Sequence, residues 1–356
     1  MNVLPADLVI AHRGTTFWAP EETEAAMRWA RNIGADYLEL DLQRTRDGYL
    51  IALHDESLVR TTNIEDVFPD RINEPVSSFL YEELLLLDAG TWFNKACPDR
   101  ARDRYTGLEI LLLEDVINIA EGKKIKRGPD GKRLMREQAG SRKIPLYEDD
   151  PADNGNRPGI YAETKIPQLF PGIEDDLVRE LTRMGWYHEN PEMLKLIEVP
   201  GKVKVANTIS RLVLQTFSRD SLQKLNQVFS GYVPKCFLLW RGDTGDDIPD
   251  DSSVSYETWL KFGVKHGATI VGPSIGGGPN NYPDLLTLWH IDIIRKYPLQ
   301  IHGYSFDTWE QMRQYGNDCH GMFTNRAEET LVWYGKAKDE QQSGQRAVKA
   351  LADLGY

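Results

Sequence analysis

The regular alternation of short apolar segments with helical segments constrains the fold of this chain more than any other feature of its sequence. Runs such as Leu-Val-Ile-Ala at 8–11 and Phe-Leu-Leu-Trp at 237–240 are almost wholly apolar, as parallel strands covered on both faces are. Eight candidate strands follow one another at 8–12, 37–43, 160–165, 212–217, 235–240, 269–271, 299–304 and 321–324. Strands that alternate with helices form parallel β/α units. The pattern therefore predicts an α/β fold, a (β/α)₈ or TIM barrel, with an open doubly wound sheet as the alternative.

Two insertions interrupt this repeat. We expect one barrel domain over residues 1–356, because barrels of this type reach such lengths with insertions. The segment 56–112 follows the second strand and a hairpin that turns at Asp47-Gly48. A segment between a strand and its helix lies at the carboxyl ends of the strands, where barrel active sites sit. We therefore expect the insertion 56–112 to cover the catalytic face.

The second insertion, 123–158, follows a helix, so we expect it at the opposite face of the barrel. Its part 123–143 carries nine Lys and Arg residues against two acidic ones. A solvated surface loop is the favoured interpretation, and contact with anionic lipid is the alternative. The run 272–279, rich in Gly and Pro, follows the sixth strand at the catalytic face. It suits a lid better than a phosphate-binding loop, since no helix beginning with Lys-Ser or Lys-Thr follows it.

The second strand and the third strand carry acidic side chains on their inner faces. Successive side chains of a strand alternate between faces, so Glu39 and Asp41 share one face and the leucines between them share the other. Glu163 and Lys165 repeat this spacing. Like charges buried together are costly, and a hard divalent cation would remove that cost. We expect Glu39, Asp41 and Glu163 to bind Mg²⁺ or Ca²⁺ and Lys165 to face a phosphate, with an inward salt-bridge cluster as the alternative.

Two histidines end β segments at the predicted catalytic face. His12 ends the first strand and is followed by Arg13 and Gly14, while His54 ends the return strand of the hairpin. Histidine suits general acid–base catalysis near neutral pH, and an arginine can hold a phosphate through two parallel hydrogen bonds. We expect His12 and His54 to transfer protons and Arg13 to bind phosphate.

A series of short motifs occurs in a fixed order along most of the chain. They are His12-Arg13-Gly14, Pro20-Glu21-Glu22-Thr23, Glu39-Leu40-Asp41, Thr45-Arg46-Asp47-Gly48, Leu53-His54-Asp55, Thr61-Thr62-Asn63, the Leu-Asp-Ala-Gly-Thr-Trp-Phe run at 87–93, Leu113-Glu114-Asp115-Val116, Glu163-Thr164-Lys165 and Gln215-Thr216-Phe217-Ser218. Together they resemble the glycerophosphodiester phosphodiesterase family, of the phosphatidylinositol phosphodiesterase-like barrel superfamily.

The resemblance implies a barrel hydrolase that splits glycerophosphodiesters, such as glycerophosphocholine, into an alcohol and glycerol 3-phosphate. It implies an acid–base pair in His12 and His54, a metal site in Glu39, Asp41 and Glu163, and phosphate binding by Arg13 and Lys165. The insertion 56–112 resembles the characteristic insertion of this family over the active site.

Three departures from the family pattern occur, none of them in the expected catalytic set. Glu22 replaces the Asn of Pro-Glu-Asn-Thr, Tyr304-Ser305-Phe306-Asp307 stands where the family reads Trp-Thr-Val-Asn, and Thr324-Asn325-Arg326-Ala327 stands where it reads Thr-Asp-x-Pro. Tyr304 is therefore expected to line the substrate pocket in place of a tryptophan. Gln215 and Phe217 share a strand face and are candidates for the same pocket, with a layer of the barrel core as the alternative.

Charge and composition narrow the remaining functions. A net charge of −12 disfavours nucleic-acid binding, which needs a basic face, so we expect a small-molecule substrate. No run approaches the roughly 20 apolar residues of a membrane span, and three scattered cysteines indicate no disulfide framework. The chain shows no signal peptide, which favours the cytoplasm by default, or the periplasm or export if a leader was removed. Oligomeric state is left open.

Several alternatives share these residues. A phospholipase D-like enzyme acting on lysophospholipids or sphingomyelin could use the same site, and a phosphatidylinositol-specific phospholipase C is a more distant option. A membrane-acting enzyme would show an exposed apolar rim, for which the runs at 79–80 and 84–87 are candidates. A degenerate barrel that only binds phosphate or metal is the non-enzymatic alternative. The nucleophile is either water or a hydroxyl of the substrate's glycerol, and the second route gives a cyclic phosphate.

Overall fold

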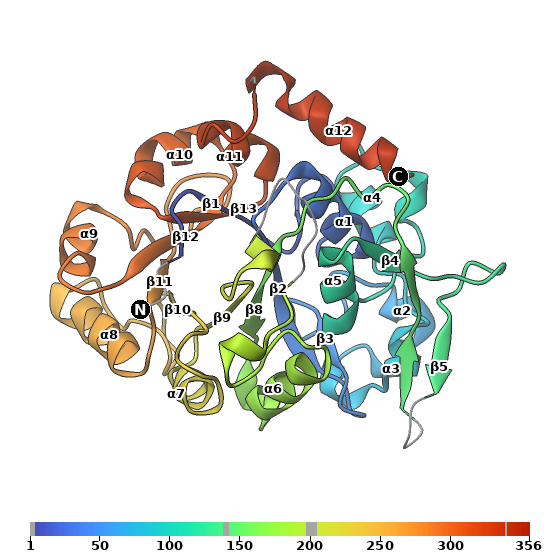
Figure 1. Ribbon diagram of the computed structural model, residues 1–356, viewed down its shortest axis with the longest axis horizontal. Helices are drawn as coiled ribbons and strands as arrows, with labels where there is room; N and C mark the ends of the chain where they lie inside the picture. Colours follow the sequence, from blue (N-terminus) through green and yellow to red (C-terminus); the bar gives the residue numbers. More distant parts are fainter. Residues whose placement is uncertain (1–3, 138–141, 197–204, 339) are drawn as a thin grey trace.

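Eight parallel strands close into a barrel surrounded by helices in the computed structural model, which describes residues 4–137, 142–196, 205–338 and 340–356 (Figure 1). The barrel strands are β1 (Leu8–Ala11), β2 (Tyr37–Arg44), β8 (Gly159–Thr164), β9 (Leu212–Thr216), β10 (Lys235–Leu239), β11 (Ile270–Pro273), β12 (Gln300–Phe306) and β13 (Gly321–Thr324). The ring is closed because β1 pairs with both β13 and β2, with Ala11 in register with Thr324 and with Leu38. The predicted (β/α)₈ barrel is confirmed, and the open doubly wound sheet is wrong.

A helix follows each barrel strand on the outside of the ring. These helices are α1 (Glu24–Ile33), α5 (Leu113–Ala120), α6 (Ile173–Arg183), α7 (Arg219–Val228), α8 (Ser253–Lys265), α9 (Leu288–Ile294), α10 (Trp309–Tyr315) and α11 (Ala327–Trp333). A further helix, α12 (Ser343–Asp353), packs across α1 and α11. Within the described ranges, no helix is both long and apolar enough to cross a bilayer.

The side chains of β2 divide between two layers of the core. Leu38, Leu40 and Leu42 are buried in the cluster that joins the barrel to α1 and α5. Tyr37 belongs instead to the cluster that fills the barrel interior together with Ile10. Because successive side chains alternate between faces, Glu39 and Asp41 follow Tyr37 on the interior side and lie above this apolar plug. The apolar cluster therefore fills the part of the barrel interior below the acidic residues, which lie toward the carboxyl ends of the strands.

The first insertion contains three short helices, α2 (Ile64–Val67), α3 (Tyr81–Leu84) and α4 (Thr91–Ala96), and follows β3 (Leu50–Ala52), which pairs antiparallel with β2. Arg60 and Tyr105 of this segment hydrogen-bond Glu21 and the carbonyl of Trp18, both in the loop after β1. Those contacts lie at the carboxyl end of β1. The domain boundaries 1–356 and 56–112 themselves stay predictions.

Of the six residues in the candidate apolar rim, 79–80 and 84–87, three are buried, two are partly buried and one is exposed. Phe79, Leu84 and Leu87 are at most 3 % exposed, and Leu86 is the large exception at 63 %. These runs therefore form the core of the small helices.

The second insertion is a pair of β-ribbons rather than a solvated loop. It contains β4 (Lys123–Ile125), paired with β7 (Tyr147–Asp149), and β5 (Met135–Glu137), paired with β6 (Lys143–Pro145). The Arg133 side chain is only 2 % exposed and bonds Asp115 and Glu109. Asp115 lies in the first turn of α5, and helices run antiparallel to the barrel strands, so the ribbon reaches the catalytic side.

The expectation of a solvated loop at the far face is therefore wrong for the described part of this insertion; residues 138–141 lie outside it. The reason is that four of the basic side chains, Arg127, Arg133, Arg142 and Lys143, pair with carboxylates from distant parts of the sequence and pack the segment against the rest of the fold.

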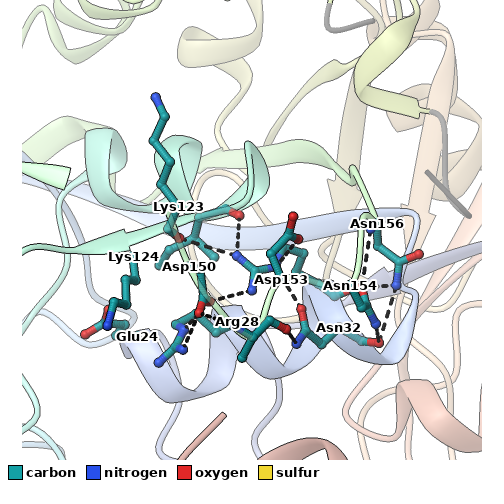
Figure 2. A network of polar contacts seen from close by, with 12 residues as sticks. Glu24, Arg28, Asn32, Lys123, Lys124, Asp150, Asp153, Asn154 and Asn156 are labelled. Atoms are coloured by element: carbon teal, nitrogen blue, oxygen red, sulfur yellow. Dashed lines mark hydrogen bonds and ion pairs between the residues drawn. The ribbon is translucent and has the colours of Figure 1, made fainter. Parts of the chain in front are cut away.

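An ion cluster attaches the end of this insertion to α1 (Figure 2). Asp150 accepts hydrogen bonds from Nε and Nη2 of Arg28, both at 2.8 Å, and from Nη2 of Arg31 at 2.6 Å. Asn32 donates to the carbonyl of Ala152, and Asn156 donates to that of Arg31. The segment that leads back to β8 is thus held against the C-terminal half of α1.

The run 272–279 is partly regular structure. Gly272 and Pro273 end β11, and the N–H of Ile275 donates to the carbonyl of Tyr304 at 2.9 Å. Ser274 and Ile275 are buried. The first half of this run is therefore attached to β12, which limits any lid to the residues that follow.

Candidate active site

The turn His12-Arg13-Gly14 projects two side chains over the barrel mouth. The N–H of His12 still pairs with the carbonyl of Thr324, and the N–H of Arg13 donates to Glu39 Oε2 at 2.7 Å. Gly14 has φ +77°, and a Cβ at this position would lie 2.7 Å from the carbonyl carbon of Ala26 in α1. A side chain is therefore excluded at residue 14, which explains the glycine after the histidine and arginine.

Three buried carboxylates meet below this turn. One oxygen from each of Glu39, Asp41 and Glu163 lies within 4.8 Å of the other two. Gln215 donates to Glu39 Oε1 at 2.7 Å, while Asp41 Oδ2 is buried without a hydrogen-bond partner among the described residues. A buried carboxylate oxygen without a hydrogen bond is costly, even with Arg13 Nε 3.3 Å away, and a cluster of carboxylate oxygens is the donor set that hard divalent cations prefer. The cluster fits a divalent cation.

The electrostatics of the cluster lead to the same conclusion. Burial, together with Asp41 and Glu163 nearby, raises the pKa of Glu39 well above its usual range, and burial raises the pKa of Glu163 to about 8. Burial alone would raise the pKa of Asp41, but Lys165, His54 and Arg13 outweigh it and hold that pKa below its usual range. Lys165 Nζ lies 3.4 Å from Asp41 and 3.3 Å from Glu163. Lys165 and Arg13 together do not neutralise three carboxylates.

The two histidines each use Nδ1 to contact a protein side chain. His12 Nδ1 lies 2.7 Å from Asn325 Oδ1, and His54 Nδ1 lies 2.6 Å from Asp55 Oδ1. Burial lowers the pKa of His12 to about 3 and also lowers the pKa of His54, where Asp41 and Asp55 oppose the effect. Both rings are therefore neutral near pH 7, and Nε2 of each is available for proton transfer.

An ion network missed by the sequence analysis joins His54 to Arg13. Arg60 donates to both oxygens of Glu21, at 2.9 and 2.7 Å, and to Asp55. Arg13 Nη1 donates to Glu21 at 3.1 Å, and its Nε lies 3.3 Å from Asp41. Burial alone would raise the pKa of Glu21, but Arg13 and Arg60 lower it to about 2. The insertion thus contributes a cation that fixes the partner of His54.

One cavity of about 270 Å³ brings together all of the site residues predicted from sequence. It is lined by His12, Arg13, Glu39, Asp41, His54, Glu163, Lys165, Gln215, Phe217 and Tyr304, and also by Leu238, Trp240, Tyr282 and Phe323. The role of each residue stays a prediction, but all of them line the same cavity. A wider open groove of about 940 Å³ adjoins the cavity and shares Glu163, Lys165 and Phe217 with it.

The far side of the cavity is an aromatic wall. The rings of Phe217 and Tyr304 meet edge to face at 5.8 Å, and those of Trp240 and Tyr282 meet at 5.4 Å. The Tyr304 hydroxyl donates to the carbonyl of Leu239 at 2.6 Å, which fixes its ring against the wall. Sequence reasoning missed Trp240 and Tyr282. Trp240 lies at the end of a predicted strand, a signal that could have found it, whereas Tyr282 comes from a loop.

The departures from the family pattern are also close to the site. Glu22 has φ +56° and accepts the N–H of Asp41 at 2.6 Å. Asn325 contacts both His12 and Asp307, and its Nδ2 lies 2.7 Å from Asp307 Oδ1. The carboxylate and the amide at 307 and 325 have exchanged places relative to the pattern, so the pair is retained with its order reversed.

The closed barrel with an acidic, histidine-lined cavity at the carboxyl ends of its strands has the architecture of a barrel enzyme. The model of the glycerophosphoryl diester phosphodiesterase family matches residues 12–140. A glycerophosphodiester phosphodiesterase of Bacillus subtilis is 28 % identical over 327 residues, covering 91 % of this chain and 86 % of that protein. One from Caldanaerobacter subterraneus is 42 % identical over 114 residues, or 32 % of this chain and 44 % of that protein.

Among solved structures, an Oleispira antarctica phosphodiesterase, in complex with the product sn-glycerol-3-phosphate, superposes with a TM-score of 0.58 at 15 % identity. The match covers 93 % of this chain and 98 % of that one. At this identity the likeness concerns the fold. The chain is thus similar to the glycerophosphoryl diester phosphodiesterase family over residues 12–140, and to one enzyme of that activity over most of its length.

Proposed function

We propose that this chain is a metal-assisted glycerophosphodiester phosphodiesterase that releases an alcohol and glycerol 3-phosphate. The proposal rests on one observation. Two histidines, three carboxylates and the side chains of Arg13 and Lys165 line one cavity at the carboxyl ends of the strands. The similarity to this family and to the named relatives supports the same substrate class. A protein that only binds phosphate would not need paired proton carriers beside a metal-binding cluster.

Glu39, Asp41 and Glu163 would hold the cation, with Mg²⁺ and Ca²⁺ as the candidates for an oxygen donor set. When bound, a divalent cation supplies positive charge that offsets the negative charge developing on the phosphate oxygens. Arg13 and Lys165 flank this cluster, and we assign them to the remaining phosphate oxygens. Gln215, through its bond to Glu39, orients a metal ligand and contacts the substrate side of the cavity.

His12 and His54 are assigned to proton transfer. One ring accepts a proton at Nε2 from the attacking hydroxyl. The other must first take up a proton from solvent and become an imidazolium, and it then donates that proton from Nε2 to the departing alkoxide. Each ring is held through Nδ1, which directs Nε2 to the reaction. If a hydroxyl of the substrate's glycerol attacks, phosphorus NMR will detect a cyclic phosphate at early times; if water attacks, solvent ¹⁸O will enter the first product instead.

The shape of the site favours a soluble diester over a membrane lipid. The aromatic wall of Phe217, Tyr304, Trp240 and Tyr282 gives the cavity an apolar side for the carbon skeleton of one alcohol, and the adjoining groove has room for the other. Only one of the six residues that could have formed a membrane-docking rim is exposed. Lysophospholipid or sphingomyelin cleavage is therefore the less favoured alternative.

A head-group panel tests the proposal. Chelated protein would be assayed with Mg²⁺, Ca²⁺ or Mn²⁺ against glycerophosphocholine, glycerophosphoethanolamine, glycerophosphoinositol, lysophosphatidylcholine vesicles and sphingomyelin vesicles. We expect glycerol 3-phosphate from at least one soluble diester, and slower or no turnover of the vesicles. Turnover confined to the vesicles would support the phospholipase D-like alternative, and the absence of turnover with every metal would overturn the proposed enzyme.

A further inference from the structure

A chain of hydrogen bonds leads from His12 away from the cavity to a neighbouring loop. His12 Nδ1 lies 2.7 Å from Asn325 Oδ1, and Asn325 Nδ2 lies 2.7 Å from Asp307 Oδ1. The other carboxylate oxygen of Asp307 lies 2.6 Å from Asn280 Nδ2, which also lies 2.9 Å from the Ser305 hydroxyl. Asn325 and Ser305 are 5 % and 1 % exposed, so water competes little with these bonds.

The donor and acceptor groups in this series of hydrogen bonds allow each bond to be donated in only one direction. An ionised carboxylate accepts hydrogen bonds and donates none, so Asp307 must receive an N–H from Asn325 and another from Asn280. Because the amide nitrogen of Asn325 faces Asp307, its carbonyl oxygen faces His12. A carbonyl oxygen also only accepts, so Nδ1 of His12 must carry the hydrogen. In the neutral ring Nε2 is then the unprotonated nitrogen.

We propose that Asn325 and Asp307 are positioning residues that fix the ring orientation and tautomer of His12, with Nε2 ready to accept a proton. The catalytic consequence rests on the proposed function, in which His12 transfers a proton. The second proposed proton carrier, His54, is oriented differently, by the carboxylate of Asp55. The two rings thus receive their orientation from separate networks that can be altered independently.

Asn280 extends this chain to the wall of the substrate cavity. It lies two residues before Tyr282, which lines the cavity and contacts Trp240 and Tyr304. The loop that carries Asn280 therefore touches both the carboxylate behind His12 and the aromatic wall. Through it, the orientation of His12 and the shape of the cavity depend on the same backbone segment.

The substitution Asp307→Asn gives a sharp test because it replaces one carboxylate oxygen with an amide nitrogen and keeps the shape of the side chain. Asn280 still requires an acceptor at residue 307, so the new amide turns its oxygen to Asn280 and its nitrogen to Asn325. Asn325 must then turn its own amide, which presents N–H to His12 and moves the ring hydrogen to Nε2. We expect kcat to fall by about 10- to 100-fold, with KM changed less than kcat.

The reciprocal variant Asp307→Asn/Asn325→Asp restores the direction of donation, because the carboxylate introduced at residue 325 accepts from both neighbours. We expect it to recover most of the kcat lost in Asp307→Asn and in Asn325→Asp alone. Asp292→Asn and Asn317→Ala alter exposed residues of the same types and should leave kcat unchanged. If the double variant is no more active than the worse single variant, the positioning role is wrong.

The tautomer can be read without any substrate by two-bond ¹H–¹⁵N NMR of histidine-labelled protein, with the His12 signals assigned through His12→Gln. We expect a hydrogen on Nδ1 in the wild type and on Nε2 in Asp307→Asn. An unchanged tautomer in Asp307→Asn, or a wild-type hydrogen on Nε2, would overturn the inference. If the tautomer responds as expected but the wild type hydrolyses no diester, the positioning stands and the proposed function fails.

Discussion

At the scale of single residues, the site owes its chemistry to polar side chains held where water is scarce. His12 is neutral because burial lowers its pKa to about 3, and Glu163 is a weak acid because burial raises its pKa to about 8. Lys165 and Arg13 keep Asp41 ionised between them. The same burial therefore makes the histidines proton acceptors and leaves the carboxylates in need of a cation.

Replacing either histidine tests this residue-scale account. His12→Gln and His54→Gln retain polar side chains, so we expect an intact fold with kcat lower by about two to four powers of ten, the range of general acid–base catalysis. Circular dichroism and the melting temperature would confirm the fold, and initial rates of diester hydrolysis would give kcat. Near-normal activity in either variant would remove that histidine from the mechanism.

At the scale of elements, the strands were predictable because their signal is local. Each predicted barrel strand overlaps an observed one with ends within about two residues. Helix α1 is likewise bounded by residues of the usual capping types, Thr23 at its start and Gly34, with φ +108°, at its end. The ribbons of the second insertion were not predictable in this way. The ribbons are held in place by the ion pairs of Arg133 with Asp115 and of Asp150 with Arg28 in α1. Local periodicity in the sequence does not reveal such long-range contacts.

The anchor of the second insertion makes a stability prediction (Figure 2). Asp150 is fully buried between Arg28 and Arg31, so Asp150→Asn leaves two guanidinium groups without their counter-charge. Removing one partner of a buried ion pair costs about 3 to 5 kcal/mol. Arg31 keeps a second carboxylate, Asp153, at 3.5 Å, so we expect the free energy of unfolding in urea at pH 7 to fall by an amount near the lower end of that range. The exposed neighbour Asp149→Asn should change it little.

The carboxylate of Asp150 also predicts how the free energy of unfolding changes with pH. Burial alone would raise the pKa of Asp150, but Arg28 and Arg31 lower it from 3.8 to about 2. A group whose pKa is lower in the folded state stabilises the fold above its unfolded value, so this contribution is present above pH 3.8 and is lost as the pH falls to about 2. Urea unfolding across this window should show a smaller loss of stability in Asp150→Asn than in the wild type. Equal slopes in the two proteins would contradict the assignment.

The first insertion makes an activity prediction. Arg60 holds Asp55, the partner of His54, and also Glu21, the partner of Arg13. Arg60→Gln should lower kcat by about tenfold, the usual size of effects at residues that orient catalytic groups. The exposed Arg104→Gln in the same insertion should leave kcat unchanged. Loss of activity in both variants alike would show that the insertion acts only through general stability.

At the scale of the whole molecule, barrel closure brings the site together. His12 and Asn325 are 313 residues apart in sequence and meet only because β1 and β13 are neighbours in the ring. The predicted site residues could be found from strand faces, strand ends and motifs, since each signal lies within a few residues. The residues that the sequence analysis missed, Arg60, Asp307 and Tyr282, sit on loops whose direction depends on the closed fold.

We propose that a cation held by Glu39, Asp41 and Glu163 acts together with His12 and His54 on a glycerophosphodiester. The most direct test measures glycerol 3-phosphate release by exhaustively chelated protein, before and after titration with Mg²⁺ or Ca²⁺, for the wild type, Asp41→Asn and His54→Gln. We predict that chelation abolishes wild-type turnover and that the cation restores it, that Asp41→Asn needs a higher cation concentration, and that His54→Gln stays slow at saturating cation. Full turnover by the chelated wild type would contradict the account.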